Sequence, residues 1–307
     1  MTLNRFLIDL RVLFIGKRKT KTPITRRLKR KYPLFSTPGY HRYKKSCVIP
    51  QEQSFRFGGI ARLYGQAAFE HIQNAHVCVV GIGGVGTWAV EALARSGVGQ
   101  LTLVDADEVC ITNVNRQIHA LDGSSGKPKV AEMASRIRAI NPEIRIDTVE
   151  KFYTESSSNS ILSPGFDYLF DAIDSVKHKV HLLHKCRQRD IPVITSGGAG
   201  GRWDPTQVMV EDLSRTRNDP LLSLVRKQLR QRHGFPRERR WKFRIPAVYT
   251  PEEPKFPRED GTVCERREKG ADYRLNCDNG FGTMSSITGT LGFAAAAHIL
   301  KAIAQID

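Results

Sequence analysis

Four glycines within one short segment are the first residues whose spacing could do chemistry: Gly81, Gly83, Gly84 and Gly86. The apolar run "HVCVVG" leads into them, and a helical pattern, "VGTWAVEALARSG", follows and ends at Gly97. Glycine lets the backbone approach phosphate oxygens, and the start of a helix supplies free N–H groups and a positive dipole end. The segment therefore predicts a nucleotide phosphate-binding turn.

The residues that follow indicate which nucleotide is bound. Asp105 ends the next apolar run, 19 residues past Gly86, where an acid accepts hydrogen bonds from a ribose. Amides and cations follow within 25 residues of Asp105, namely Asn113, Asn115, Arg116, Lys127 and Lys129. A nicotinamide ring needs an open pocket, whereas a triphosphate needs cations to neutralise its charge. Because "FDAIDS" adds Asp171 and Asp174 at a strand end, where a carboxylate beside a triphosphate usually holds Mg²⁺, we expect ATP and Mg²⁺ rather than NAD.

The elements that must position these residues alternate between strands and helices. Strands are predicted at 76–81, 100–107, 144–150, 166–174, 191–196 and 207–212, and helices at 85–97, 127–142 and 176–190. This alternation predicts an α/β fold, a Rossmann-like, mostly parallel sheet with helices on both faces. Residues 213–272 are rich in Pro and Arg and are interpreted as a basic insertion or lid, after which a glycine-rich loop leads to a C-terminal helix.

Charge is distributed unevenly along the chain. The whole chain carries +17; residues 1–50 carry +13 and residues 215–244 carry +9, which leaves −5 for the remainder. We therefore expect a disordered basic extension at 1–50 and a folded domain at 51–307. Basic blocks commonly contact nucleic acid or anionic membranes, and a solvated tail is the alternative. The first block also has the composition of a mitochondrial presequence, so a mitochondrial location is the alternative to a cytoplasmic one.

Cysteine usage and hydropathy narrow the class of protein further. The six cysteines form no C-x-x-C pair and there is no secretory signal, so neither a zinc knuckle nor a disulfide framework is expected, and a reducing compartment fits best. His298 and Lys301 interrupt the apolar run near the C-terminus. We expect a packed terminal helix there and no stable membrane insertion.

The motifs "GIGGVG", "VDAD", "NVNRQ", "GKPKV" and "DAID", in that order, resemble the adenylating domain of the ubiquitin-activating-enzyme (ThiF/MoeB/HesA) superfamily. In that superfamily a carboxylate attacks the α-phosphate of ATP and forms an acyl-adenylate. The resemblance implies that Asp105 binds the ribose, that Asn115, Arg116 and Lys129 contact the phosphates, and that Asp174 holds magnesium. Asn113 belongs to the same expected ATP site.

The superfamily also uses an arginine from an N-terminal segment, often across a homodimer. Arg56 and Arg62 in "RFGGIARLYG" are the two candidates, and their spacing does not choose between them. A homodimer is therefore an expected assembly.

One branch resembles this chain along residues 54–300. The motifs "RFGGIARLYG", "NRQIHAL", "DAIDS", "GGAGGRWDPTQV", "DGTVC" and "GFGTM" are similar to those of the tRNA threonylcarbamoyladenosine dehydratases. These enzymes use ATP to cyclise and dehydrate the threonylcarbamoyl group on the adenosine beside the anticodon. The likeness implies tRNA as substrate and a cysteine-desulfurase or sulfur-acceptor system as a further partner.

The basic segment suits an RNA substrate, because Lys and Arg contacts to phosphates supply most non-specific affinity. The expected RNA-binding residues are Arg226, Lys227, Arg230, Arg232, Arg239 and Arg240. Trp203, Phe235 and Trp241 flank this segment and are candidates for stacking on an unpaired base, with core packing as the alternative.

Other functions stay open at this point. Adenylation of a ubiquitin-like sulfur-carrier protein would use Cys264 or Cys277 in a covalent thioester, and both are otherwise bystander thiols. A non-catalytic, nucleotide-dependent RNA-binding module is a further alternative, and a nicotinamide dehydrogenase a distant one. His119 is either a site residue or a packed histidine.

Overall fold

The computed structural model describes residues 50–238, 240–258, 260–265 and 281–305. The chain divides into two units, residues 1–47 and 48–307, and the fold below is that of the second. Most of the expected basic extension, together with Arg239 and Cys277, lies outside the described residues.

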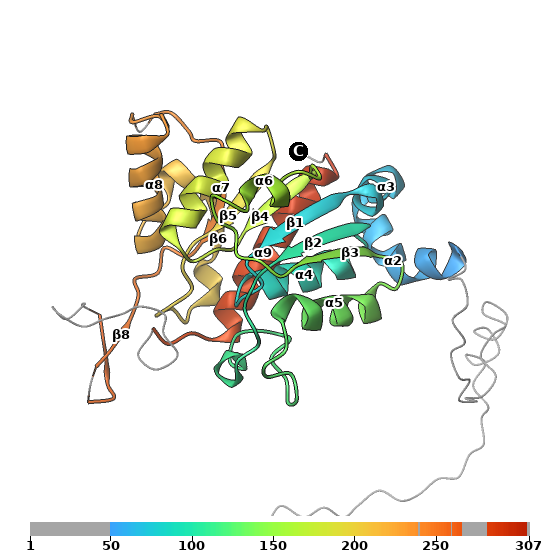
Figure 1. Ribbon diagram of the computed structural model, residues 1–307, viewed down its shortest axis with the longest axis horizontal. Coiled ribbons are helices and arrows are strands. Elements are labelled where there is room, and N and C mark those ends of the chain that lie inside the picture. The colour runs from blue at the N-terminus through green and yellow to red at the C-terminus, as the bar shows by residue number, and fades with distance from the viewer. Residues whose placement is uncertain (1–49, 239, 259, 266–280, 306–307) are drawn as a thin grey trace, which may run out of the picture. The chain divides into compact units, whose positions relative to one another are not determined.

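A seven-stranded sheet forms the centre of the domain, in the order β3-β2-β1-β4-β5-β7-β6 (Figure 1). Its strands are β1 (His76–Val80), β2 (Gln100–Val104), β3 (Arg145–Val149), β4 (Tyr168–Asp171), β5 (Val193–Ser196), β6 (Met209–Asp212) and β7 (Pro246–Tyr249). Six strands run parallel, and β6 pairs antiparallel with β7 at the edge. The predicted mostly parallel α/β sheet is confirmed.

Helices cover both faces of this sheet, as predicted. The main helices are α4 (Gly86–Arg95), α5 (Lys129–Ile140), α7 (Val176–Gln188), α8 (Pro220–Arg232) and α9 (Ser285–Ile303). In β1, Val77 and Val79 pack with α4, α5 and α9, whereas Cys78 and Val80 pack with α7 and α8. A strand that is buried on both faces must be apolar at every position, which explains the unbroken run in the sequence.

The remaining elements complete the domain. They are α2 (Pro50–Tyr64), α3 (Gln66–Asn74), α6 (Ser158–Ile161), the 3₁₀ turns η1 (Ile111–Asn113), η2 (Pro205–Gln207) and η3 (Leu213–Arg215), and the strand pair β8 (Phe256–Pro257) and β9 (Val263–Cys264). Gly65, with φ of 90°, separates α2 from α3. A backbone angle in this region is readily adopted only by glycine, so the chain can turn sharply there.

The interpretation of residues 213–272 as an insertion or lid is corrected by the position of β7. This strand lies inside the sheet, between β5 and β6. Helix α8 packs beside α7 and buries Leu222, Val225 and Leu229. Residues 213–250 are therefore part of the main fold. The sequence obscured this because β7 contributes only four residues, between a basic segment and a proline-rich one.

Helix α9 is long and apolar enough to cross a membrane by length and composition, with a mean hydropathy of 1.3 over its most apolar window. In the structure it packs along α4, where a side chain at Gly292 would come within 2.7 Å of the Val85 carbonyl oxygen. Ile287, Leu291 and Ile299 are fully buried in the core. The predicted C-terminal helix is thus a core element of this domain.

Candidate functional site

The glycine loop joins β1 to α4 at the edge of the sheet where the parallel strands end. A side chain at Gly86 would lie 1.8 Å from the Gly81 carbonyl oxygen, and one at Gly81, where φ is 95°, would lie 2.8 Å from the Ala172 oxygen. Within the described part of the chain, no atom beyond the neighbouring residues lies within 4 Å of the corresponding position at Gly83. Two glycines are therefore required for close packing, whereas Gly83 faces open space.

Both sides of Ile82 are held by hydrogen bonds. Its amide donates to Asp105 Oδ2 at 2.6 Å, and its carbonyl oxygen lies 3.2 Å from His119 Nε2. Since a carbonyl only accepts, Nε2 must carry the hydrogen. In a trans peptide the next amide points away from that carbonyl, so these bonds direct the Gly83 N–H away from His119. This orientation makes it available to a ligand anion.

The electrostatics of these buried groups follow from their surroundings. Burial lowers the pKa of His119 to about 4, so the ring is neutral near pH 7, and its Nδ1 has no hydrogen-bond partner among the residues that the structure describes. Burial also raises the pKa of Asp105, while the Asp107 amide, Lys129 and the Ile82 amide act in the opposite direction. The Asp107 amide donates to Asp105 Oδ1 at 2.8 Å, so each carboxylate oxygen holds one amide of the loops around it.

Arg116 and Asn115 lie beside the glycine loop. The Arg116 carbonyl oxygen accepts hydrogen bonds from Trp88 Nε1 at 3.0 Å and Thr288 Oγ1 at 3.1 Å, which fixes the backbone from two helices. The Arg116 guanidinium donates to the Asn115 side-chain oxygen at 3.0 Å, and Asn115 Nδ2 donates to the Thr283 carbonyl at 3.0 Å. The structure thus brings both predicted phosphate-contacting residues to Gly84, whose added Cβ would lie 3.7 Å from Arg116 Cδ.

Lys129 and Asn113 have partners inside the protein. The ammonium of Lys129, which is buried, lies 2.7 Å from Asp107 Oδ2, and this pair sits beside Asp105. Asn113 is also buried, and its side-chain oxygen accepts the Cys110 amide at 3.0 Å. Lys129 therefore lies at the site, and Asn113 shapes the η1 turn that leads to Asn115.

Two aspartates that the sequence placed together have different environments. Asp171, at the end of β4, is fully buried with Lys179 at 2.9 Å and Thr195 at 2.7 Å. Asp174 is exposed, two residues beyond Ala172, which contacts the glycine loop. Among the described residues no three His, Cys, Asp or Glu side chains form a metal-binding group. Any magnesium here must take its remaining ligands from phosphate oxygens and water, which is how Mg²⁺ is usually held.

The N-terminal arginines lie away from the loop of their own chain. Arg56, on α2, donates from Nη1 to the Ile140 carbonyl at 3.0 Å, at the end of α5 opposite Lys129. A helix of that length spans about 17 Å. Arg62 is exposed on the same helix. Neither arginine is brought to the glycine loop within one copy of the chain.

The basic segment crosses from one edge of the sheet to the other. Helix α8 begins at Asp219, beside the loop after β5, and its far end leads towards the start of β7. Arg226 is half-buried and bonds Thr216, and Arg230 bonds the Pro236 carbonyl at 3.2 Å. The exposed members of the expected RNA-binding set are Lys227, Arg232 and Arg240.

The candidate covalent and stacking residues differ in how far they are buried. Cys264 is half-buried in β9, with Sγ 3.6 Å from the Phe256 carbonyl oxygen. Phe235 is 2% exposed and packs against Phe243, so it is a core residue. Trp203 and Trp241 are 56% and 57% exposed.

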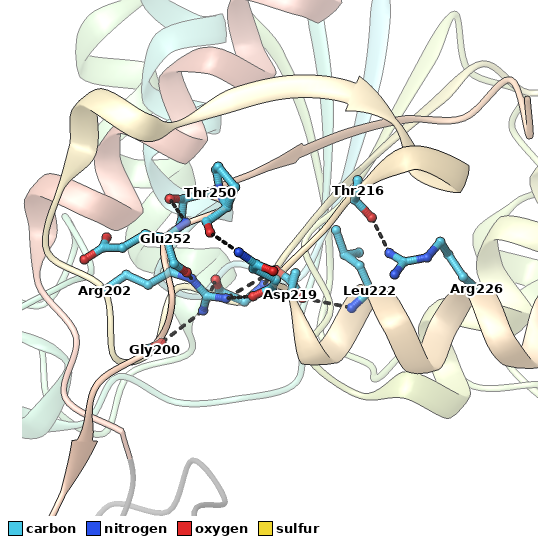
Figure 2. Close-up of polar contacts among 11 residues, drawn as sticks. Gly200, Arg202, Thr216, Asp219, Leu222, Arg226, Thr250 and Glu252 are labelled. Carbon is cyan, nitrogen blue, oxygen red and sulfur yellow. Dashed lines mark hydrogen bonds and ion pairs between the residues drawn. The ribbon is translucent and has the colours of Figure 1, made fainter. Parts of the chain in front are cut away.

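Sequence reasoning missed two buried networks near the same edge of the sheet. One joins Lys179 and Thr195 to Asp171, and the other is built around Arg202 and Asp219 (Figure 2). The motif "GGAGGRWDPTQV" signals the second, because an arginine between glycine-rich and turn-forming segments has many backbone carbonyls within reach. Nothing in the sequence around Lys179 distinguishes it from the exposed lysine at 177.

Comparisons with known proteins identify the family of this chain. The model of the ThiF family matches residues 59–307. The tRNA threonylcarbamoyladenosine dehydratase of Escherichia coli (strain K12) is 47% identical over 257 residues, 83% of this chain and 96% of that protein. The solved structure of TcdA (CsdL) superposes with a TM-score of 0.77 at 46% identity, covering 84% of this chain and 97% of that one. A complex of E. coli tRNA N6-threonylcarbamoyladenosine dehydratase, TcdA, with ATP has a TM-score of 0.74 at 44% identity and the same coverage.

Proposed function

This chain belongs to the ThiF family, and from that premise we propose that it is an ATP-dependent enzyme that dehydrates threonylcarbamoyladenosine in tRNA. The observation that carries the proposal is the likeness to the E. coli dehydratase along almost the whole length of that protein. The ATP complex of a close structural relative supports ATP as the co-substrate.

The residues at the glycine loop fit a bound ATP. The open space at Gly83 and the outward Gly83 amide provide room and a donor for phosphate oxygens. Asp105 would accept hydrogen bonds from the ribose with the lone pairs that its two amides leave over. Arg116, Asn115 and Lys129 supply polar groups and positive charge at the same edge, and charge-assisted hydrogen bonds of this kind are the strong ones.

The reaction proposed has two steps. A threonyl carboxylate oxygen attacks the α-phosphorus of ATP, and the bond to the β-phosphate breaks to release pyrophosphate. An atom of the neighbouring carbamoyl group then attacks the activated carbonyl carbon, the ring closes, and AMP leaves with the carboxylate oxygen. Intramolecular closure requires positioning more than a nucleophilic side chain, so the scheme needs no cysteine.

Magnesium belongs to this proposal as the counter-ion of the phosphates. Asp174 would hold it, because its exposed carboxylate follows the strand end that contacts the glycine loop. When bound, the ion neutralises charge that develops on the phosphates. Arg116 and Lys129 would orient the same phosphates and leave the carboxylate of the substrate a clear approach.

A homodimer would complete the site. Arg56 is held at the end of α5 that lies away from the glycine loop, and Arg62 is exposed on the same helix, so a second copy would have to supply one of them. The exposed basic residues of α8 and of the segment after it indicate where RNA lies. Lys227, Arg232 and Arg240 would contact tRNA phosphates. A cysteine-desulfurase or sulfur-acceptor partner is part of the proposal by family likeness alone, and the bacterial relative supports a cytoplasmic location.

The test is mass spectrometry of nucleosides from tRNA that carries the open threonylcarbamoyl group, incubated with the protein and Mg-ATP and digested without nucleophiles. We expect loss of one water from the modified nucleoside, dependent on ATP. Asp174→Ala should abolish that loss. Glu143→Ala, which removes an exposed carboxylate at the opposite edge of the sheet, should not.

An unchanged nucleoside despite ATP binding would overturn the proposal. In that case a carrier protein's C-terminus would be the next substrate to test, with Cys264→Ser as the variant.

A further inference from the structure

A buried arginine ties together three loops that the chain places at the carboxyl edge of the sheet. Arg202 is 4% exposed, and its guanidinium donates to the carbonyls of Gly198, Gly200 and Asn218 at 3.0 Å each (Figure 2). Its Nε donates to the Glu252 carbonyl at 3.3 Å. These acceptors follow β5, precede α8 and follow β7, so one side chain fixes their relative positions.

Two buried carboxylates hold the same loop through its amides. Asp219 Oδ2 accepts the Gly198 amide at 2.9 Å. Glu252 Oε2 accepts the amides of Trp203 at 3.2 Å and of Asp204 at 3.0 Å. Because hydrogen bonds to charged groups are stronger than neutral ones, the backbone on both sides of Arg202 is firmly held.

This fixed loop presents a large exposed aromatic side chain. Trp203 is 56% exposed, and the Lys255 ammonium lies 5.4 Å from its ring centroid. Lys255 Nζ also pairs with Glu265 at 2.6 Å, so the cation is held in place beside the ring. Exposed indole surface contributes little to folding, since the stabilisation comes from area removed from water. A rigid backbone that displays a tryptophan beside a cation is typical of a surface for stacking nucleic-acid bases.

The tryptophan loop adjoins the nucleotide site. The Gly201 amide donates to the Gly282 carbonyl at 2.8 Å, and the next carbonyl, that of Thr283, accepts from Asn115 at 3.0 Å. Trp203 is therefore two residues after Gly201, which is bonded to the segment that contacts Asn115, a predicted phosphate-binding residue.

Phe152 provides the contrast. It follows β3, whereas Trp203 lies in the loop after β5, and β2, β1 and β4 separate these two strands in the sheet. Its exposure, 60%, is similar to that of Trp203.

We propose that Trp203 stacks on an unpaired base of the tRNA anticodon loop and so positions the modified adenosine at the ATP site. This inference rests on the proposed function for the identity of the RNA. The Arg202 clamp makes the platform rigid, which lowers the ordering cost of binding.

The experiment measures binding of a fluorescently labelled anticodon stem-loop RNA that carries threonylcarbamoyladenosine, by anisotropy in the absence of ATP. Trp203→Ala should weaken the Kd by about tenfold, the usual scale of one base stacked on an aromatic ring. Trp203→Phe should recover most of that loss, and Phe152→Ala should stay within about twofold of the wild type. Because stacking is not ionic, the slope of log Kd against log salt should be the same for Trp203→Ala and the wild type.

Turnover separates this role from a purely structural one. With Trp203→Ala we expect a raised KM for RNA, an unchanged KM for ATP and an unchanged melting temperature. Wild-type affinity in Trp203→Ala, or an equal loss in Phe152→Ala, would overturn the inference while leaving the dehydratase activity in place. A wild-type protein that binds the RNA through Trp203 but removes no water would instead contradict the proposed function.

Discussion

The two halves of the sheet hold their loops by different physical means. In the half formed by β1, β2 and β3, close backbone contacts at Gly81 and Gly86 and amide bonds to Asp105 shape the loop. In the half formed by β4, β5 and β7, buried ionic networks around Lys179 and Arg202 do so. The first half also contains an ion pair, between Lys129 and Asp107, but the Asp107 side chain is half exposed, whereas both partners of each ion pair in the second half are buried. The loops at the carboxyl ends of the strands are therefore held by close backbone packing at glycines in one half and by buried ion pairs in the other.

We expect the greatest loss of stability when the ion pair between Lys179 and Asp171 is broken. Lys179→Met leaves the buried Asp171 carboxylate without its cation, and we expect a loss of about 3–5 kcal/mol in the free energy of unfolding, measured with urea. Lys177→Met, on the exposed face of the same helix, should change it by less than about 0.5 kcal/mol. Equal losses in the two variants would remove the distinction drawn here.

The corresponding test of the backbone half compares two glycines in one loop. Gly86→Ala places a Cβ against the Gly81 carbonyl, so the helix start must shift, at a cost of about 3 kcal/mol. Gly83→Ala meets no protein atom and should keep the wild-type melting temperature. If calorimetry shows the order reversed, the loop does not pack as described.

Burial of His119 makes the stability of the fold depend on pH. Its folded pKa of about 4 lies below the ordinary value of 6.5 because the ring is buried. Between these pH values the unfolded chain binds a proton that the folded chain does not, so stability falls as pH is lowered through this range. The loss is about 3 kcal/mol.

His119→Gln keeps an N–H donor for the Ile82 carbonyl and removes the titration. Urea unfolding at pH 7 and pH 4 should therefore show a smaller pH dependence in this variant than in the wild type. An equal pH dependence in the two proteins would mean that His119 has the same pKa in the folded and the unfolded chain.

We expect smaller changes in stability and in RNA binding from substitutions of Arg226 and Lys227, which are adjacent on α8. Arg226→Ala breaks the bond to Thr216 and should cost about 1 kcal/mol of unfolding free energy. Lys227→Ala should leave stability unchanged and lower the salt dependence of RNA binding by a slope of about 0.7 to 0.9. An RNA affinity that responds only to Arg226 would place the RNA elsewhere.

The sequence predicted the backbone half well because its signals are local. A glycine spacing, an apolar strand and an acid at the next strand end each occupy a few consecutive residues, and the structure brings Gly81, Asp105 and Arg116 together as expected. The ionic half depends on pairs far apart in the chain. Arg202 and Glu252 are separated by 50 residues, and no local pattern links them.

Strand β7 was missed for a related reason. Its four residues are too few to show an alternating or a long apolar pattern. Pairing with β5 and β6 in the folded sheet identifies them as a strand. The burial of Arg226 could not be predicted either, because Lys227 beside it has the same charge and is exposed. Position on the helix face decides which of the two reaches Thr216.

The position of β7 and α9 also sets an order on how the domain can be assembled as it is synthesised. Among the described strands β6 pairs with β7 alone, so residues 209–212 cannot join the sheet before residues 246–249 have been made. Helix α4, which starts at the glycine loop, is covered by α9, residues 285–303. The half that carries the glycine loop is thus completed by α9, and until α9 has been made the apolar surface of a nascent chain would be exposed, a state prone to aggregation.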